Sequence, residues 1–151
     1  MKVTVQVQEL LRACKLAENA LGSGRILTRL QALRLYTHEN RLRIEATDTE
    51  AGIRAEVAGI TIEQPGQFMI DGKLLIDVLR SLATETVVIN RLAGSIQIAA
   101  FNVQPLADEH FSWNAWEVTG ETKTIPATLL ARLLRDTVPA ARRQAMTAPG
   151  G

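Results

Sequence analysis

The sequence predicts an α+β fold made of two successive β-α-β-β-β units. Polar and apolar residues alternate over residues 2–7, which is the period-two pattern of a strand with one buried face. From residue 8 the apolar residues recur at helical spacing instead, and three strand-like segments follow. A short strand, a helix and three strands return in the same order over residues 67–104, so the chain repeats its plan.

The first unit is predicted to contain one helix and, after it, three strands. The helix is expected to end at Gly22-Ser23-Gly24, because glycine commonly terminates helices. Residues 60–62 are expected to extend the last strand past a bend at Gly59. The apolar stripe of the helix consists of Leu10, Cys14, Ala17 and Leu21. The strands are predicted at residues 30–36, 41–46 and 53–57, with a tight turn at residues 38–40.

The second unit begins with a short strand at residues 67–70. A helix is expected to run from Asp71, a suitable N-cap, to about Ala83. Its buried stripe is predicted to be Leu75, Val78, Leu79 and Leu82. The three strands that follow are predicted at residues 86–90, 95–100 and 101–104.

The rest of the chain is expected to start a second domain of the same kind. The first domain is placed at residues 1–122, whose last part, from residue 108, is a polar linker. Residues 123–145 would supply the first strand and helix of the next domain, with the helix starting at Ala127 and interrupted by Pro139. Residues 146–151 are expected to form a flexible tail.

Composition excludes several classes of protein. The single cysteine, Cys14, rules out an intramolecular disulfide and a cysteine-rich zinc site. No apolar run has the length of a signal peptide or a membrane span, so we expect a soluble, cytoplasmic protein. With 17 basic and 16 acidic residues the net charge is +1, so any nucleic-acid surface must come from local segregation of charge. No cofactor or metal is expected.

The sequence contains only weak signals for catalytic residues. Asp48 and Glu50 lie in a connection between strands, where an aspartate commonly bonds nearby amides, so a structural turn is favoured over acid–base chemistry. His38 and His110 have no nucleophile or carboxylate at a suggestive spacing. The glycines at 22 and 24 follow a helix rather than a strand, which disfavours a nucleotide-binding loop.

The order of these segments resembles the first domain of the bacterial DNA sliding clamp, the beta subunit of DNA polymerase III. The resemblance covers about residues 1–145 and depends on many weak, collinear matches. Among them are the opening segment of residues 1–12, the two strands joined through Thr49-Glu50, the Pro65-Gly66 turn and the helix of residues 73–82. It implies a DNA sliding clamp or clamp-derived protein, a processivity factor in DNA replication that is not an enzyme. The implied partners are double-stranded DNA, bound independently of sequence, and replicative polymerase or clamp-loader subunits.

The resemblance also implies which residues would bind DNA. Clamp helices line the central hole, so the duplicated topology predicts two helices side by side with their basic residues on one surface. The candidates are Arg12, Lys15, Lys73, Arg80, Arg132 and Arg135, together with Arg25 in the loop after the first helix. Ordinary solvated helix faces and a solvated loop arginine remain the alternatives.

Two segments depart from the clamp pattern. The chain has no proline-rich segment after Arg25. The predicted hairpin over residues 95–104 is short and uncharged, so self-association is open but a family-type ring is not expected from this chain alone.

The candidates for a partner interface are Phe101, Trp113 and Trp116, although the tryptophans could instead pin the linker to the domain. A fragment, a naturally short variant and a clamp relic recruited for another task all fit. The alternative function is an interaction module or replisome regulator that does not encircle DNA.

Overall fold

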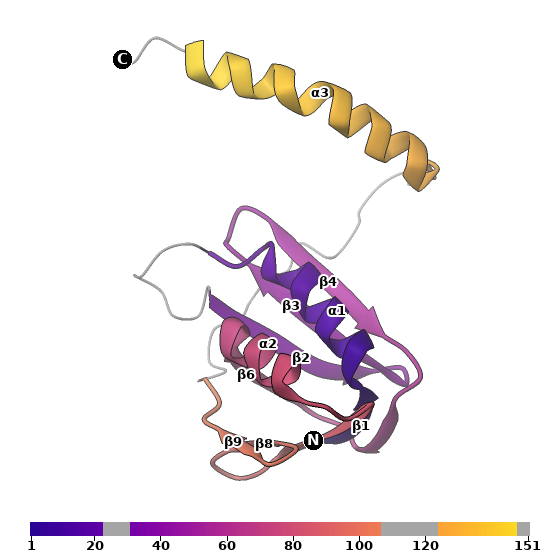
Figure 1. The fold of residues 1–151 in the computed structure, drawn as a ribbon, viewed down its shortest axis with the longest axis vertical. Coiled ribbons are helices and arrows are strands. Elements are labelled where there is room, and N and C mark those ends of the chain that lie inside the picture. The colour runs from indigo at the N-terminus through magenta and orange to yellow at the C-terminus, as the bar shows by residue number, and fades with distance from the viewer. Residues whose placement is uncertain (23–30, 107–123, 148–151) are drawn as a thin grey trace. The chain divides into compact units, whose positions relative to one another are not determined.

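The computed structural model describes residues 1–22, 31–106 and 124–147. The chain divides into two compact units, Met1–Asn114 and Ala115–Gly151. Figure 1 shows the helices and strands of each unit.

The first unit confirms the predicted duplication. A β-α-β-β-β succession occurs twice, with one additional strand between the two copies. In chain order the elements are β1 (Lys2–Gln6), α1 (Val7–Glu18), β2 (Ala32–His38), β3 (Arg41–Thr47), β4 (Gly52–Val57), β5 (Thr61–Gln64), β6 (Gln67–Asp71), α2 (Gly72–Ser81), β7 (Thr86–Arg91), β8 (Ile96–Ile98) and β9 (Phe101–Val103).

These strands form two antiparallel sheets, of order β5-β1-β7-β8-β9 and β4-β3-β2-β6. The expectation that residues 60–62 extend β4 is wrong, because β5 belongs to the other sheet and pairs with β1, with Ile62 opposite Val3. Gly59, at φ 68°, lies between the two strands and has the left-handed conformation that glycine adopts readily. The chain therefore changes sheets at this bend.

The two helices lie side by side, and α1 also packs on β2, β3 and β4 (Figure 1). Leu10 and Cys14 of α1 and Leu75 and Leu79 of α2 are buried, as the helical spacing predicts. The sheets contribute alternate residues to the same core, including Leu35, Leu42, Ile44, Phe68, Val87 and Ile89. Each fully buried aliphatic side chain contributes about 1.5–3 kcal/mol relative to leaving it exposed.

The helix ends are set by side chains near each boundary. α1 ends at Glu18, before the predicted boundary at Gly22, because the Asn19 Nδ2 group donates to the carbonyl oxygens of Lys15 and Leu16 at 3.1 Å. At the start of α2, the Asp71 carboxylate accepts a 2.8 Å hydrogen bond from the Leu74 amide, which confirms the predicted N-cap.

The hairpin between β8 and β9 is as short as the sequence predicts. Each strand has three residues, and Ile98 pairs directly with Phe101 across Ala99 and Ala100. Ala99 takes a φ of 51° in this turn, although it has a Cβ atom. β9 is an edge strand of its sheet.

The described part of the second unit is the helix α3 (Ala127–Thr147). Its predicted start at Ala127 is confirmed, but the predicted interruption at Pro139 is wrong. A proline removes one backbone donor and crowds the preceding turn, while about three turns before it keep their own hydrogen bonds. Thr124, Ile125 and Pro126 show no strand geometry.

The predicted division into domains stays a prediction. Met146 and Thr147 belong to α3, whereas residues 148–151 lie outside the described residues. Among the helices that the structure describes, none is both long and apolar enough to cross a membrane.

Candidate nucleic-acid interface

The predicted basic residues of the first unit lie on its two helices. Arg12 and Lys15 on α1 and Lys73 and Arg80 on α2 are all exposed. Because α1 and α2 pack against each other, one helical layer carries all four residues. This confirms the side-by-side placement of the helices, whereas contact with DNA stays a prediction.

Acidic residues offset part of this positive charge. α1 carries Glu9 and Glu18 beside its two basic residues, so its charges balance. On α2, Asp77 Oδ1 lies 3.1 Å from Arg80 Nη1, and both side chains are well exposed. An exposed pair of this kind is worth about 0–1 kcal/mol, so its main effect is to reduce the local positive potential. The helical layer is therefore only weakly basic.

The other sequence candidates fall elsewhere. Arg132 and Arg135 are exposed on α3, in the second unit. Phe101 lies on edge strand β9 and is 42% exposed. Arg25, His110, Trp113 and Trp116 lie outside the described residues.

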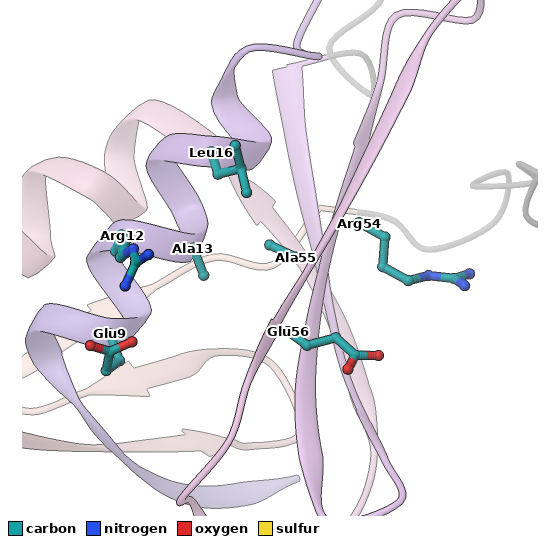
Figure 2. A pocket seen from close by; sticks show the side chains of 7 residues that line it. All are labelled: Glu9, Arg12, Ala13, Leu16, Arg54, Ala55 and Glu56. Carbon is teal, nitrogen blue, oxygen red and sulfur yellow. The ribbon is translucent and has the colours of Figure 1, made fainter. Parts of the chain in front are cut away.

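A shallow groove of about 350 Å³ lies between α1 and edge strand β4 (Figure 2). Ala13 and Ala55 are buried in its lining, and Leu16 is exposed beside them. Figure 2 shows Arg54 and Glu56 pointing away from α1, on the far side of β4. The remaining lining residues are Glu9 and Arg12. The groove thus brings together charges of both signs and contains no nucleophile.

Asp48 has the structural role that the sequence predicts. Its Oδ1 atom accepts hydrogen bonds from the amides of Glu50 at 3.0 Å and Ala51 at 2.7 Å. These backbone bonds lower the pKa of the Asp48 carboxyl group. They also hold Thr49 at a φ of 85°, which a β-branched residue rarely adopts. The carboxylate therefore stabilises a strained turn.

Within residues 1–22, 31–106 and 124–147, the other reactive side chains form no catalytic group. The His38 Nε2 atom lies 3.6 Å from Glu39 at an exposed position. Burial raises the pKa of the Cys14 thiol to about 12, which leaves it protonated and unreactive. Among the described residues, no three His, Cys, Asp or Glu side chains are grouped so that they could hold a metal ion.

A buried carboxylate on the opposite side of the four-stranded sheet was not predicted from the sequence. Glu45 of β3 is only 2% exposed, although it lies on the face that points away from the core. Its Oε1 atom accepts hydrogen bonds from Tyr36 Oη at 2.7 Å and Arg54 Nε at 2.6 Å. Arg34 Nη1 lies 3.5 Å from Oε2. These partners follow from the strand register, in which Arg34, Glu45 and Arg54 are direct neighbours.

A second row of charges lies beside this one. Glu56 of β4 accepts a 2.7 Å hydrogen bond from Arg43 Nε and lies 3.2 Å from Arg41 Nη1. The hydrogen bond from Arg43 is the main reason that the pKa of Glu56 is lowered. We call this surface the arginine face, defined by Arg34, Arg41, Arg43 and Arg54.

Several solved structures of similar fold are bacterial clamp subunits. The DNA polymerase III beta chain of Streptococcus pneumoniae matches with a TM-score of 0.80 and 14% identity, over 88% of this chain and 38% of that one. The beta subunit of Caulobacter crescentus matches with a TM-score of 0.77 and 23% identity, over 89% and 38%. The sliding clamp of Bacillus subtilis matches with a TM-score of 0.76 and 20% identity, over 89% of this chain and 39% of that one.

This chain therefore spans less than two fifths of the length of these structures. No curated protein matches it. The family model for the DNA polymerase III beta subunit, N-terminal domain, matches residues 1–113, which include β1 to β9, α1 and α2. The chain belongs to the DNA polymerase III beta subunit family, through the N-terminal domain of that family.

Proposed function

We propose that this chain acts as a DNA sliding clamp or clamp-derived module in DNA replication, with no chemistry of its own. Its role would be to hold duplex DNA through the helical layer and so to support the processivity of a polymerase. The observation that carries the proposal is the juxtaposition of α1 and α2, which puts Arg12, Lys15, Lys73 and Arg80 on one exposed layer. Membership of the clamp family supports the same role.

Binding of this kind depends on phosphates and not on bases. Each lysine or arginine that neutralises a phosphate releases condensed counterions, so affinity falls steeply with salt and changes little with sequence. Because α1 is charge-balanced and α2 carries only one excess positive charge, we expect the affinity of a single chain to be low. A dissociation constant of about 10⁻⁴–10⁻⁶ M is typical of such contacts at physiological salt.

The test is to remove charge from α1 and follow binding to a labelled duplex by fluorescence anisotropy over a salt series. The Arg12→Gln/Lys15→Gln double variant should bind more weakly to every sequence, and the salt slope should fall by about two. Arg25→Ala should lower the slope by about one. Lys2→Gln is the control for the loss of one positive charge outside the helices, because Lys2 lies on β1 and pairs with Glu63 at 2.7 Å.

An equal loss of duplex affinity in the control and in the double variant would count against the proposal. Unchanged binding in the double variant would count against it as well. Either would mean that the helical layer is not the DNA-binding surface.

The weak charge of the helical layer favours a second candidate, an interaction module or replisome regulator that does not encircle DNA. Its partners would be replicative polymerase or clamp-loader subunits, and the exposed Phe101 on edge strand β9 is an available contact. Absence of duplex binding at low salt, together with binding to such a subunit that Phe101→Ala weakens, would favour this function over the first.

A further inference from the structure

β4 is the longest strand that lies at a sheet edge in the described part of the chain. It has six residues, whereas the edge strands β6, β5 and β9 have five, four and three. Its inner side pairs with β3 in one continuous register, and it contains no proline. Natural edge strands are often short, bulged or interrupted by proline, because their outward N–H and C=O groups can pair with another chain. The outer side of β4 is therefore suited to strand addition.

The residues of β4 are complementary to their own sequence read backwards. When two copies of the strand pair antiparallel around Ala55, Arg54 of each copy lies opposite Glu56 of the other. Ile53 of each copy then lies opposite Val57, and both are apolar. Residues directly opposite each other project from the same face of a sheet, and an opposite-charge pair there is worth about 0.2–1 kcal/mol. The strand thus matches a second copy of itself on both faces.

Charge also selects this register over its neighbours. A two-fold axis perpendicular to the sheet keeps each face on its own side, so the axis must pass beside one residue. If it passed beside Arg54, the two copies of this arginine would lie directly opposite each other, and an axis beside Glu56 would do the same to the glutamates. Like charges in that position are destabilising. Ala55 is the centre that avoids both contacts.

The groove between α1 and β4 lies along this edge (Figure 2). Ala13 and Ala55 are buried in its lining, and their small side chains allow another chain to come close. Leu16 is 54% exposed beside them, so a strand added along β4 would cover apolar surface there. The net charge of the chain is only +1, which leaves little overall repulsion between two copies.

We propose that β4 pairs antiparallel with β4 of a second copy of this chain, around a two-fold axis at Ala55. The contact is isologous, because each copy presents the same surface, so it closes at two chains and does not propagate. The four-stranded sheets of the two copies join into one, with both α1 helices on the same side of it. Such a dimer differs from a ring joined through β9.

The first measurement is the mass of the full chain by light scattering over a range of protein concentrations. The mass should rise from that of one chain to that of two. Hydrogen–deuterium exchange at the same concentrations should show slower exchange of the β4 amides in the dimer, because those on the outer side gain acceptors, and unchanged exchange in β9. A chain that is monomeric at every concentration, or a dimer with unchanged β4 amides, would overturn the proposal.

Charge reversal tests the register. Glu56→Lys places a lysine opposite Arg54 of the other copy, so dimerisation should weaken about tenfold or more. Glu63→Lys is the matched control, since it makes the same change of charge on edge strand β5, where Glu63 also pairs with a basic residue. Thermal melts followed by circular dichroism check that both variants stay folded, because exposed pairs contribute only about 0–1 kcal/mol each. Equal weakening by the two variants would indicate an effect of overall charge and would contradict the proposal.

Truncation of a leucine tests the groove independently of charge. Leu16→Ala removes apolar surface beside β4 and should weaken the dimer several-fold. Leu74→Ala makes the same change on α2, where Leu74 is 43% exposed, and should leave the dimer intact. A dimer that Phe101→Glu dissociates and that Glu56→Lys and Leu16→Ala leave intact would be joined through β9, and the proposal would be wrong. These measurements contain no DNA, so they are independent of whether the helical layer binds a duplex.

Discussion

Glu45 and Glu56 occupy neighbouring positions on the arginine face but differ in their surroundings. Glu45 is 2% exposed and has three donors, whereas 31% of the Glu56 side chain is exposed and two arginines flank it. The free energy of an ion pair depends on how far its members are removed from water. The two glutamates should therefore contribute differently to stability, although the sequence around them is similar.

We predict that Glu45→Ala lowers the free energy of unfolding by about 1–3 kcal/mol. The substitution leaves Tyr36 Oη and Arg54 Nε without the acceptor that each uses in the native chain. Glu56→Ala is the matched control and should cost about 1 kcal/mol or less, because its pairs are more exposed. Urea denaturation of the three proteins measures both values. Equal losses would show that the burial of Glu45 has no energetic consequence.

The elements of the first unit follow from local patterns in the sequence. Period-two alternation predicts β1, β3 and β4, helical spacing predicts α1 and α2, and Asp71 predicts where α2 begins. The change of sheet at β5 was not predictable from a four-residue segment, because its partner β1 lies about 60 residues earlier in the chain. The arginine face was missed for a related reason. Alternate charged residues on β2, β3 and β4 look like a solvated surface until the register places Arg34, Glu45 and Arg54 beside one another.

The candidate site was likewise predictable from the sequence only in part. Local spacing correctly places Arg12, Lys15, Lys73 and Arg80 on exposed helix surfaces. The balance of charge on that layer depends on which acidic residues share it, such as Asp77 beside Arg80. Contact with DNA remains a prediction for all of them.

The connection between β3 and β4 should be sensitive to acid. The folded-state pKa of Asp48 is lowered by the amides of Ala51 and Glu50, so the stability contributed by its charged form is present above the unfolded-state pKa of about 3.9. That contribution is lost as the pH falls through the lower, folded-state pKa. Asp48→Asn keeps an acceptor oxygen for the amides but cannot ionise. We therefore predict that the unmodified chain melts at a higher temperature than Asp48→Asn near neutral pH, and that the gap closes in strong acid.

Thermal melts over a pH series measure this gap. Glu50→Gln serves as the control, since it removes a charge from the same turn while leaving both hydrogen bonds to Asp48 in place. A gap between the unmodified chain and Asp48→Asn that stays constant down to strongly acid pH would contradict the prediction.

Assembly is the property of the whole molecule on which its proposed role depends most. In the clamps that this chain resembles, neighbouring subunits join head to tail through an edge strand. The corresponding edge strand of this chain is β9. β9 has only three residues, and residues 95–104 contain no charged side chain. Such an edge offers few main-chain hydrogen bonds and no ion pairs to a neighbouring subunit. We therefore predict that this chain alone forms no family-type ring and is a monomer or a differently built dimer.

Light scattering on a sizing column, over a range of protein concentrations, gives the mass directly. A differently built dimer should bury more than about 1,000 Å² in total if it is stable. Phe101→Glu distinguishes the routes of association, because a charge at this 42% exposed edge position would disrupt any oligomer joined through β9 and leave other dimers intact. A stable closed oligomer that Phe101→Glu dissociates would contradict the prediction, because it would show that an edge strand of three residues is enough to close a ring. In that case the ring would arise from copies of this one chain, and the weak charge of each helical layer would be multiplied around the DNA.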